Sequence, residues 1–277
     1  MKNNKELVTI SDIIEWDKFN WSKAVYFWER CLRISDKSRV LYESDYEIRQ
    51  CKSVFSKICF PVCRTSVRAE NSCDRNLNLL KDKKVLELGG RCGGLSLWAA
   101  SLGADVICSD LENPENAASV IHGKYPELKK SIRYEAIDAL NIPYEDHFDV
   151  ICFKSVLGGV ARVHENAEHE MFEQIHKALK SDGKLLFAEN LVAAGLHTWA
   201  RKMFRKHGKS WRYQQFEELR ILCSKYFDQN YRTVGFVGIF GLNECMKALF
   251  GFLDSILFDW CLPENRRYIF IDFCTKK

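Results

Sequence analysis

Apolar and polar positions along residues 83–277 follow the pattern of an α/β protein. Short apolar runs predict buried strands, and longer stretches with apolar residues at helical spacing predict the helices between them. Strands that alternate with helices favour a mostly parallel sheet with helices on both faces. Strands are predicted at 85–88, 106–108, 132–137, 147–153, 185–189, 233–240 and 267–273, and helices at 95–100, 114–124, 165–179 and 243–258.

The first 82 residues have a different pattern and are predicted to form an N-terminal helical cap on the domain at 83–277. Helical spacing in 7–34 places Trp21 and Trp28 on one face, with Val25 close by. This face could pack on the main domain, cover the active site as a lid, or touch lipid. A second helical segment, near 243–263, is expected as an insertion between the last two strands.

The segment 84–110 carries the strongest chemical signal. A predicted strand leads into a glycine cluster that includes Gly89, Gly90 and Gly93, then a helix, then a second strand that ends at Asp110. Glycine allows a sharp turn and a close approach of backbone to ligand. An acid at the end of the second strand can accept hydrogen bonds from both hydroxyls of a ribose. This order is typical of a nucleotide-binding half.

Two common nucleotide motifs do not fit. The chain lacks the Gly-Lys-Ser/Thr ending of a phosphate-binding P-loop. Gly89 and Gly94 match the first and last glycines of the dinucleotide fingerprint. Its middle glycine, which lets a pyrophosphate approach the backbone, is replaced here by Arg91. A nicotinamide oxidoreductase is therefore disfavoured.

The same residues read as Glu87-x-Gly89-x-x-x-Gly93, which resembles the cofactor signature of class I S-adenosylmethionine-dependent methyltransferases. An acid-plus-small pair at Asp138 and a Leu-Lys-Ser-Asp-Gly-Lys-Leu element at 179–185 follow in the family's order. Arg91 departs from the usual central glycine. The resemblance implies a Rossmann-like fold with seven strands, the last one antiparallel, and S-adenosylmethionine as cofactor.

The resemblance also implies roles for individual residues. Glu87 and Arg91 would shape the amino-acid end of the cofactor, Asp110 would hold its ribose, and Asp138 would accept its adenine amine unless it is only a turn residue. Lys154 could contact the cofactor or an anionic acceptor. The full predicted cofactor set is Glu87, Gly89, Gly90, Arg91, Gly93, Asp110, Leu111, Asp138, Ala139 and Lys154.

Methyl transfer to an alcohol also requires removal of a proton. The candidate catalytic residues follow the fourth and fifth strands, at the edge where open parallel sheets bind ligands; they are His164, Glu189 and His197. Each histidine could instead be a surface or structural residue. No carboxylate cluster suggests a metal, which argues against a magnesium-dependent enzyme.

A basic stretch follows the fifth strand. Six Lys or Arg residues occur between 201 and 212 with no acid among them, and Trp199, Phe204 and Trp211 are interleaved. The stretch is either a solvated face or a binding surface for an anionic substrate or an anionic membrane. Arg201, Arg205 and Lys209 are the predicted substrate-binding residues.

Composition limits the remaining possibilities. The net charge of +4 is too small to suggest nucleic-acid binding, and the twelve cysteines include no Cys-x-x-Cys pair. No apolar signal region follows Met1, so the expected location is cytoplasmic, with possible peripheral membrane contact. The sequence does not indicate an oligomeric state.

Three further segments, 20–24, 93–98 and 211–213, resemble methyltransferases found with bacterial surface-polysaccharide assembly. This resemblance implies O-methylation of a sugar hydroxyl on a glycan or glycolipid precursor. Two alternatives remain open: an N- or O-methyltransferase of a small metabolite or lipid head group, and a non-catalytic member of the fold.

Overall fold

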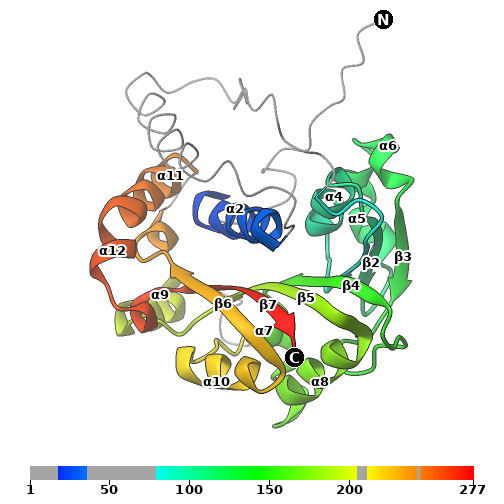
Figure 1. Cartoon of the computed structure of the whole chain (residues 1–277). Helices are drawn as coiled ribbons and strands as arrows, with labels where there is room; N and C mark the ends of the chain where they lie inside the picture. The colour runs from blue at the N-terminus through cyan, green and yellow to red at the C-terminus, as the bar shows by residue number, and fades with distance from the viewer. Residues whose placement is uncertain (1–17, 36–78, 205–210, 242–243) are drawn as a thin grey trace, which may run out of the picture.

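A computed structural model describes residues 18–35, 79–204, 211–241 and 244–277 (Figure 1). Its centre is a seven-stranded sheet with the order β3-β2-β1-β4-β5-β7-β6. The strands are β1 (Lys84–Leu88), β2 (Asp105–Asp110), β3 (Ile132–Ala136), β4 (Phe148–Lys154), β5 (Leu179–Asn190), β6 (Phe227–Val234) and β7 (Ile269–Lys276). The first five strands are parallel, and β7 runs antiparallel to β5 and β6. The predicted fold is confirmed.

Helices cover both faces of the sheet and bury a separate apolar cluster on each. One face carries α2 (Lys18–Ser35), α4 (Gly94–Ser101), α5 (Pro114–His122) and α6 (Pro126–Lys129). The other carries α7 (Leu157–Val160), α8 (Ala167–Ala178) and α10 (Phe216–Tyr226). A helix α9 (Gly195–Phe204) follows β5. Because β1, β2, β4 and β5 are parallel, the loops after them meet at one edge of the sheet.

The N-terminal helix α2 packs on the domain. Val25 and Trp28 are buried, and the Trp28 ring lies 5.9 Å from that of Trp98 in α4. The Trp28 indole nitrogen also donates to the carbonyl of Asp272 in β7 at 2.9 Å. Of the alternatives for the aromatic helix, packing on the domain therefore fits the part that is described. The side chain of Trp21 and the rest of the predicted cap lie outside the described residues.

The strand predicted at 233–240 is wrong. The strand β6 ends at Val234, because Gly235 adopts a φ of 82° and a Cβ there would lie 2.6 Å from the Tyr268 ring. The apolar residues beyond it form a loop and the 3-10 helix η2 (Gly238–Phe240). The element at 179–185 lies within β5, where the pairing with β4 is irregular and Asp182 has a φ of 61°.

Helical segments separate β6 from β7. They are α11 (Glu244–Leu253), the π-helix η3 (Asp254–Phe258), α12 (Asp259–Cys261) and the 3-10 helix η4 (Glu264–Arg266). We call α11, η3 and α12 the insertion. The single helix predicted at 243–258 is thus an α-helix that widens into a π-turn at Asp254.

Candidate cofactor site

A tight loop joins β1 to α4 and forms the first part of the site. Gly89, Arg91 and Gly93 all have left-handed backbones, with φ values of 61°, 47° and 70°. The loop is fixed to the adjacent strand, because the Gly90 amide donates to the Ser109 carbonyl at 2.7 Å. Arg91 holds a left-handed conformation, which explains why glycine is usual at this point of the signature.

Asp110 ends β2 beside this loop. Its carboxylate accepts hydrogen bonds from the backbone amides of Arg91 at 3.0 Å and Leu111 at 2.8 Å, one on each oxygen. The side chain is half-buried, so both oxygens retain a lone pair for a ligand. The structure therefore brings the predicted loop and ribose-binding acid together, and this position fits a ribose diol.

Glu87 is buried beneath the loop. Its carboxylate accepts from the backbone amides of Leu95 at 3.3 Å and Ser96 at 2.8 Å, and from the Ser96 hydroxyl. Burial raises its pKa to about 7, an effect that the nearby charge of Lys154 partly opposes. Glu87 therefore holds the start of α4 against the loop.

A histidine that the sequence analysis missed supports the loop from below. His122 is fully buried at the end of α5; its Nε2 lies 2.8 Å from the Gly93 carbonyl and its Nδ1 lies 2.7 Å from the Tyr134 hydroxyl. Burial lowers its pKa, so the ring is neutral. A neutral ring here donates from Nε2 and accepts from Tyr134. No local motif marks His122, because its partners lie in two other elements.

Asp138 and Ala139 follow β3. The Ile137 amide donates to the Asp110 carbonyl at 3.0 Å, which fixes the end of β3 beside the ribose position. Asp138 is exposed, and its Oδ1 accepts from the Leu140 amide at 2.9 Å, so it also stabilises a turn. Ala139 is buried. Asp138 thus lies where an adenine acceptor is expected, and the turn interpretation holds as well.

The loop after β4 lies against the glycine loop. A Cβ on Gly89 would lie 2.7 Å from a methyl carbon of Val156. Glu189, at the end of β5, accepts from the amides of Val156 at 2.5 Å and Leu157 at 2.8 Å through one oxygen. Glu189 is fully buried, which does not fit the predicted general base that contacts substrate. Its carboxylate instead positions the loop that faces the cofactor site.

The two candidate catalytic histidines lie in other surroundings. His197 is fully buried, with Nε2 2.7 Å from the Phe236 carbonyl and the Phe240 ring 5.3 Å away, so it packs in the domain and does not fit a base that contacts substrate. His164 is exposed and pairs with Glu170 at 3.2 Å. Together with Glu189, these residues contact three different segments and do not form one catalytic cluster.

A short segment, 211–214, closes the site beside β4 and β5. The Arg212 amide donates to the Gly158 carbonyl at 3.2 Å, and the Gln214 amide donates to the Asn190 carbonyl at 3.1 Å. The Trp211 indole covers Gly158 so closely that a Cβ there would lie 2.1 Å from its nitrogen. This segment therefore lies against the residues that follow β4 and β5, at the edge of the sheet that carries the predicted cofactor residues.

The other predicted binding residues are placed only in part. Lys154 is half-buried at the end of β4, and its charge acts on Glu87. Arg201 belongs to α9, but its side chain lies outside the described residues, as do Arg205 and Lys209. The predicted substrate-binding role of these three residues stays a prediction.

Within the described residues, one group of side chains could hold a metal ion, and it lies beneath β7. Cys223, Asp272 and Cys274 are buried there, with 3.4 Å between the two sulfurs. The Asp272 oxygens already accept from the Gln229 amide at 2.9 Å and the Asn230 backbone at 3.1 Å. Burial raises the pKa of both thiols, which keeps them protonated. The arrangement is that of a hydrogen-bonded core.

The buried carboxyl of Glu189 predicts a pH effect on stability. Burial raises its pKa to about 7 from the model-compound value of 4.5. The folded protein therefore binds this proton more tightly than the unfolded chain, and the group's contribution to stability decreases as pH rises through this range, by up to about 3 kcal/mol. Glu189→Gln cannot ionise, so its melting temperature should fall less than that of the wild type between about pH 5 and about pH 8.

Thermal unfolding at both pH values measures this difference. Glu112→Gln, at an exposed position, is the control and should follow the wild type. Parallel pH profiles for the wild type and Glu189→Gln would show that Glu189 does not titrate in the folded protein.

Comparisons with known proteins agree with this geometry. Residues 66–233, more than half of the chain, match the methyltransferase domain family. No curated protein matches significantly. Among solved structures, an S-adenosylmethionine-dependent methyltransferase from Methanosarcina mazei is 15% identical, with a TM-score of 0.50 over 71% of this chain and 93% of that one.

Two other solved structures are similar at a lower TM-score of 0.48. The PH0226 protein from Pyrococcus horikoshii is 15% identical over 71% of this chain and 83% of that one. A phosphoethanolamine N-methyltransferase from Haemonchus contortus, bound to S-adenosylhomocysteine, is 14% identical over 83% of this chain. The chain spans 52% of that enzyme's length. At these identities the neighbours show the fold alone.

The residues at this edge of the sheet fit S-adenosylmethionine. The left-handed loop allows close backbone contact, and Asp110 offers two carboxylate oxygens. Because S-adenosylmethionine has no pyrophosphate, it does not require the glycine whose place Arg91 takes. S-adenosylmethionine is therefore the cofactor for which the site is arranged. With this site and the match over 66–233, the chain belongs to the methyltransferase domain family.

Proposed function

We propose that this methyltransferase transfers the methyl group of S-adenosylmethionine to a sugar hydroxyl on a glycan or glycolipid precursor. The observation that carries the cofactor half of the proposal is the contact between Asp110 and the loop at Arg91. The acceptor half is supported by residues at the ends of β4 and β5 and in the segment 211–214. Aromatic faces and hydrogen-bonding side chains together are the groups that a carbohydrate requires.

Ser155 and Asn190 supply such polar groups at the ends of β4 and β5. The Asn190 side-chain amide donates to the Ser155 hydroxyl oxygen at 2.9 Å, so the Ser155 hydrogen is directed elsewhere and can be donated to an acceptor oxygen. Both side chains are half-buried. Ser155 also has a φ of 55°, a left-handed backbone that is uncommon outside glycine and is found often at functional sites.

Trp211 supplies the aromatic group. It is half-buried against Gly158 and Gly159, and the backbone contacts of 212–214 hold it at the same edge. A ring fixed in this way can pack against the apolar face of a sugar while Ser155 contacts a hydroxyl. This pairing favours a sugar over a purely apolar acceptor.

Methyl transfer is an in-line displacement, and most of its acceleration comes from alignment of donor and acceptor. S-adenosylmethionine supplies an electrophilic methyl group on a sulfonium. The chain's own contribution is to hold the ribose through Asp110, to keep the loop rigid through Glu87 and His122, and to position the loop after β4 through Glu189. Together these contacts fix the site before an acceptor enters.

Calorimetric titration with S-adenosylmethionine, S-adenosylhomocysteine and NAD tests the cofactor. Binding of the first two and not of NAD is expected. Transfer of a radiolabelled methyl group is then measured to nucleotide-linked sugars, to lipid-linked sugars and to phosphoethanolamine. Labelled sugar supports the proposal, whereas labelled phosphoethanolamine would assign a lipid head group instead. Failure to bind either sulfur cofactor would identify a non-catalytic member of the fold.

A further inference from the structure

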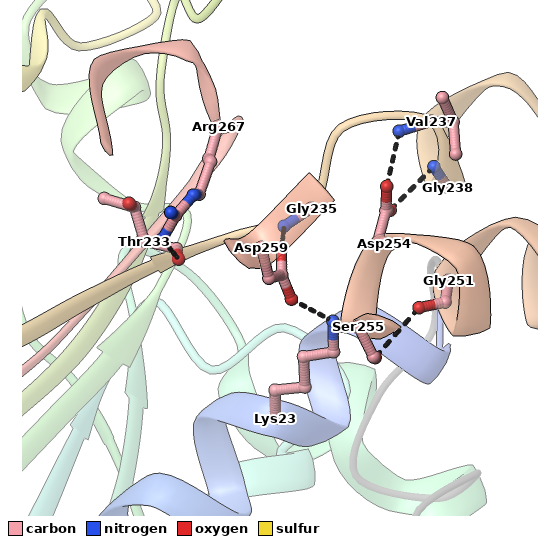
Figure 2. A network of polar contacts seen from close by, with 10 residues as sticks. All are labelled: Lys23, Thr233, Gly235, Val237, Gly238, Gly251, Asp254, Ser255, Asp259 and Arg267. Atoms are coloured by element: carbon pink, nitrogen blue, oxygen red, sulfur yellow. Dashed lines mark hydrogen bonds and ion pairs between the residues drawn. The ribbon is translucent and has the colours of Figure 1, made fainter. Parts of the chain in front are cut away.

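Two carboxylates attach the insertion firmly to the end of β6 (Figure 2). Asp254 is fully buried, and its two oxygens accept from the backbone amides of Val237 at 2.7 Å and Gly238 at 2.9 Å. A buried carboxylate with both oxygens hydrogen-bonded fixes the segment that carries it. The π-turn at 254–258 is therefore held at a defined place.

The second carboxylate connects the insertion to two other elements. Asp259 accepts from the Gly235 amide at 2.7 Å and from the Lys23 ammonium of α2 at 2.6 Å (Figure 2). Arg267 completes the attachment by donating to the carbonyls of Thr233 at 3.0 Å and Leu262 at 2.6 Å. The insertion is thus fixed to the sheet and to the N-terminal helix. The residues on its outer surface are therefore held at defined positions.

That outer surface is apolar. Trp260 is 88% exposed, and Leu249, Ile256 and Leu257 are each close to half-exposed. Burying large apolar side chains is favourable, so a group of them held at the surface by a rigid segment indicates a binding surface. We call these four residues the apolar patch.

The helix α9 adds to the same side of the molecule. His197 of α9 lies 4.9 Å from the Phe236 ring, and Phe236 lies 5.3 Å from the Phe258 ring of the π-turn. These ring contacts hold α9 next to the insertion. Two further large apolar residues of α9, Leu196 and Trp199, are exposed.

The sequence of α9 and of the segment that follows it is basic. Between Leu191 and Phe216 the sequence has six basic residues and no acid, and two of them, Arg201 and Lys202, belong to α9. The insertion contains three acids: Asp254 and Asp259 are directed inward by the contacts above, and Glu244 lies at the start of α11. Between Leu249 and Trp260, where the residues of the apolar patch lie, both acids are therefore turned away from the surface that would meet a bilayer.

We propose that the insertion and α9 dock on the surface of an anionic lipid bilayer, with the apolar patch entering the headgroup region. Exposed Trp, Leu and Ile beside basic residues are the composition of interfacial membrane-binding segments. A protein partner is less well matched, because the basic stretch would then require an equally extended acidic surface. No helix in the described part of the chain is long and apolar enough to cross a membrane.

This inference goes beyond the proposed function and needs neither cofactor nor acceptor. Flotation of the purified full chain with phosphatidylcholine vesicles, with and without phosphatidylglycerol, tests it. The wild type should bind the vesicles that contain phosphatidylglycerol, and added salt should weaken binding. Ile256→Ser, Leu257→Ser and Trp260→Ser together should lower the vesicle partition coefficient at least ~10-fold. Affinity for S-adenosylhomocysteine should stay unchanged, which shows that the variant is folded.

Matched control variants test whether the loss of vesicle binding is specific to the apolar patch. Val120→Ser with Ile221→Ser alters exposed apolar residues on α5 and α10 and should leave vesicle binding unchanged. Arg201→Glu with Arg205→Glu should reduce binding to the anionic vesicles. Equal flotation of the wild type and the triple-serine variant, or no flotation of the wild type, would overturn the proposal. A wild-type dimer that the triple-serine variant loses, without vesicle binding, would assign the patch to a second copy of the chain.

Discussion

Asp110→Ala should lower the affinity for S-adenosylhomocysteine by at least ~100-fold while the protein stays folded. The carboxylate would lose two charge-assisted hydrogen bonds to the ribose, worth about 1.5–3 kcal/mol each. It would also lose its contacts with the amides of Arg91 and Leu111, which shape the loop. The side chain is half-buried at the end of a strand, so its removal leaves the core intact. Calorimetric titration measures the affinity, and circular dichroism measures the fold.

Asp105→Ala provides the matched control at the other end of β2. Asp105 is exposed and contacts Arg133 at 3.3 Å, so its replacement should leave cofactor binding unchanged. Asp110→Asn keeps one acceptor oxygen and should fall between the wild type and the alanine variant. Unchanged affinity in folded Asp110→Ala would exclude the ribose assignment.

Gly93→Ala should have the largest effect on stability, with a loss of about 2–5 kcal/mol in the free energy of unfolding. A left-handed backbone costs a residue with a Cβ about 1–2 kcal/mol, and overpacking adds about 1–3 kcal/mol. The overpacking is specific, because the new methyl group would lie 2.3 Å from the His122 Nε2. Denaturant unfolding measures the loss, and cofactor affinity should fall with it because the loop is displaced.

A second glycine and a double variant test the cause. A Cβ on Gly195 would have no neighbour within 4 Å, so Gly195→Ala should leave stability within about 0.5 kcal/mol of the wild type. In Gly93→Ala/His122→Ala the imidazole that would clash with the new methyl group is absent. The loss of stability should therefore be smaller than the sum of the losses in the two single variants. Strict additivity would indicate that backbone strain alone destabilises Gly93→Ala.

The elements that could be predicted from sequence are those with a local cause. The strand 85–88, the glycine loop and Asp110 follow one another within a short segment, so their spacing alone indicates a nucleotide site. The strand β6 is hard to place from sequence because its residues alternate polar and apolar only weakly, whereas the apolar run beyond it is half-buried in a loop and a 3-10 helix. His122 was missed because both of its partners are distant in sequence.

The direction of a side chain is harder to predict than its position. The sequence places both Glu189 and Asn190 at the end of the fifth strand, but consecutive strand residues point to opposite faces. The structure directs Glu189 into the core beneath the loop after β4, and Asn190 toward Ser155. A shift of one residue in the predicted register would exchange these two environments. Glu189 thus lies at the predicted end of the strand, with its carboxylate buried beneath the loop after β4.

The hydrogen bond between Trp28 and Asp272 has a consequence for how the chain folds during synthesis. It joins residues 244 positions apart, and the ion pair of Lys23 with Asp259 spans 236. Helix α2 is thus synthesised well before the residues that it contacts. The strand β7 also lies between β5 and β6, so the sheet stays open until β7 has left the exit tunnel. Until Asp259 and β7 emerge, α2 exposes the apolar face that it later buries.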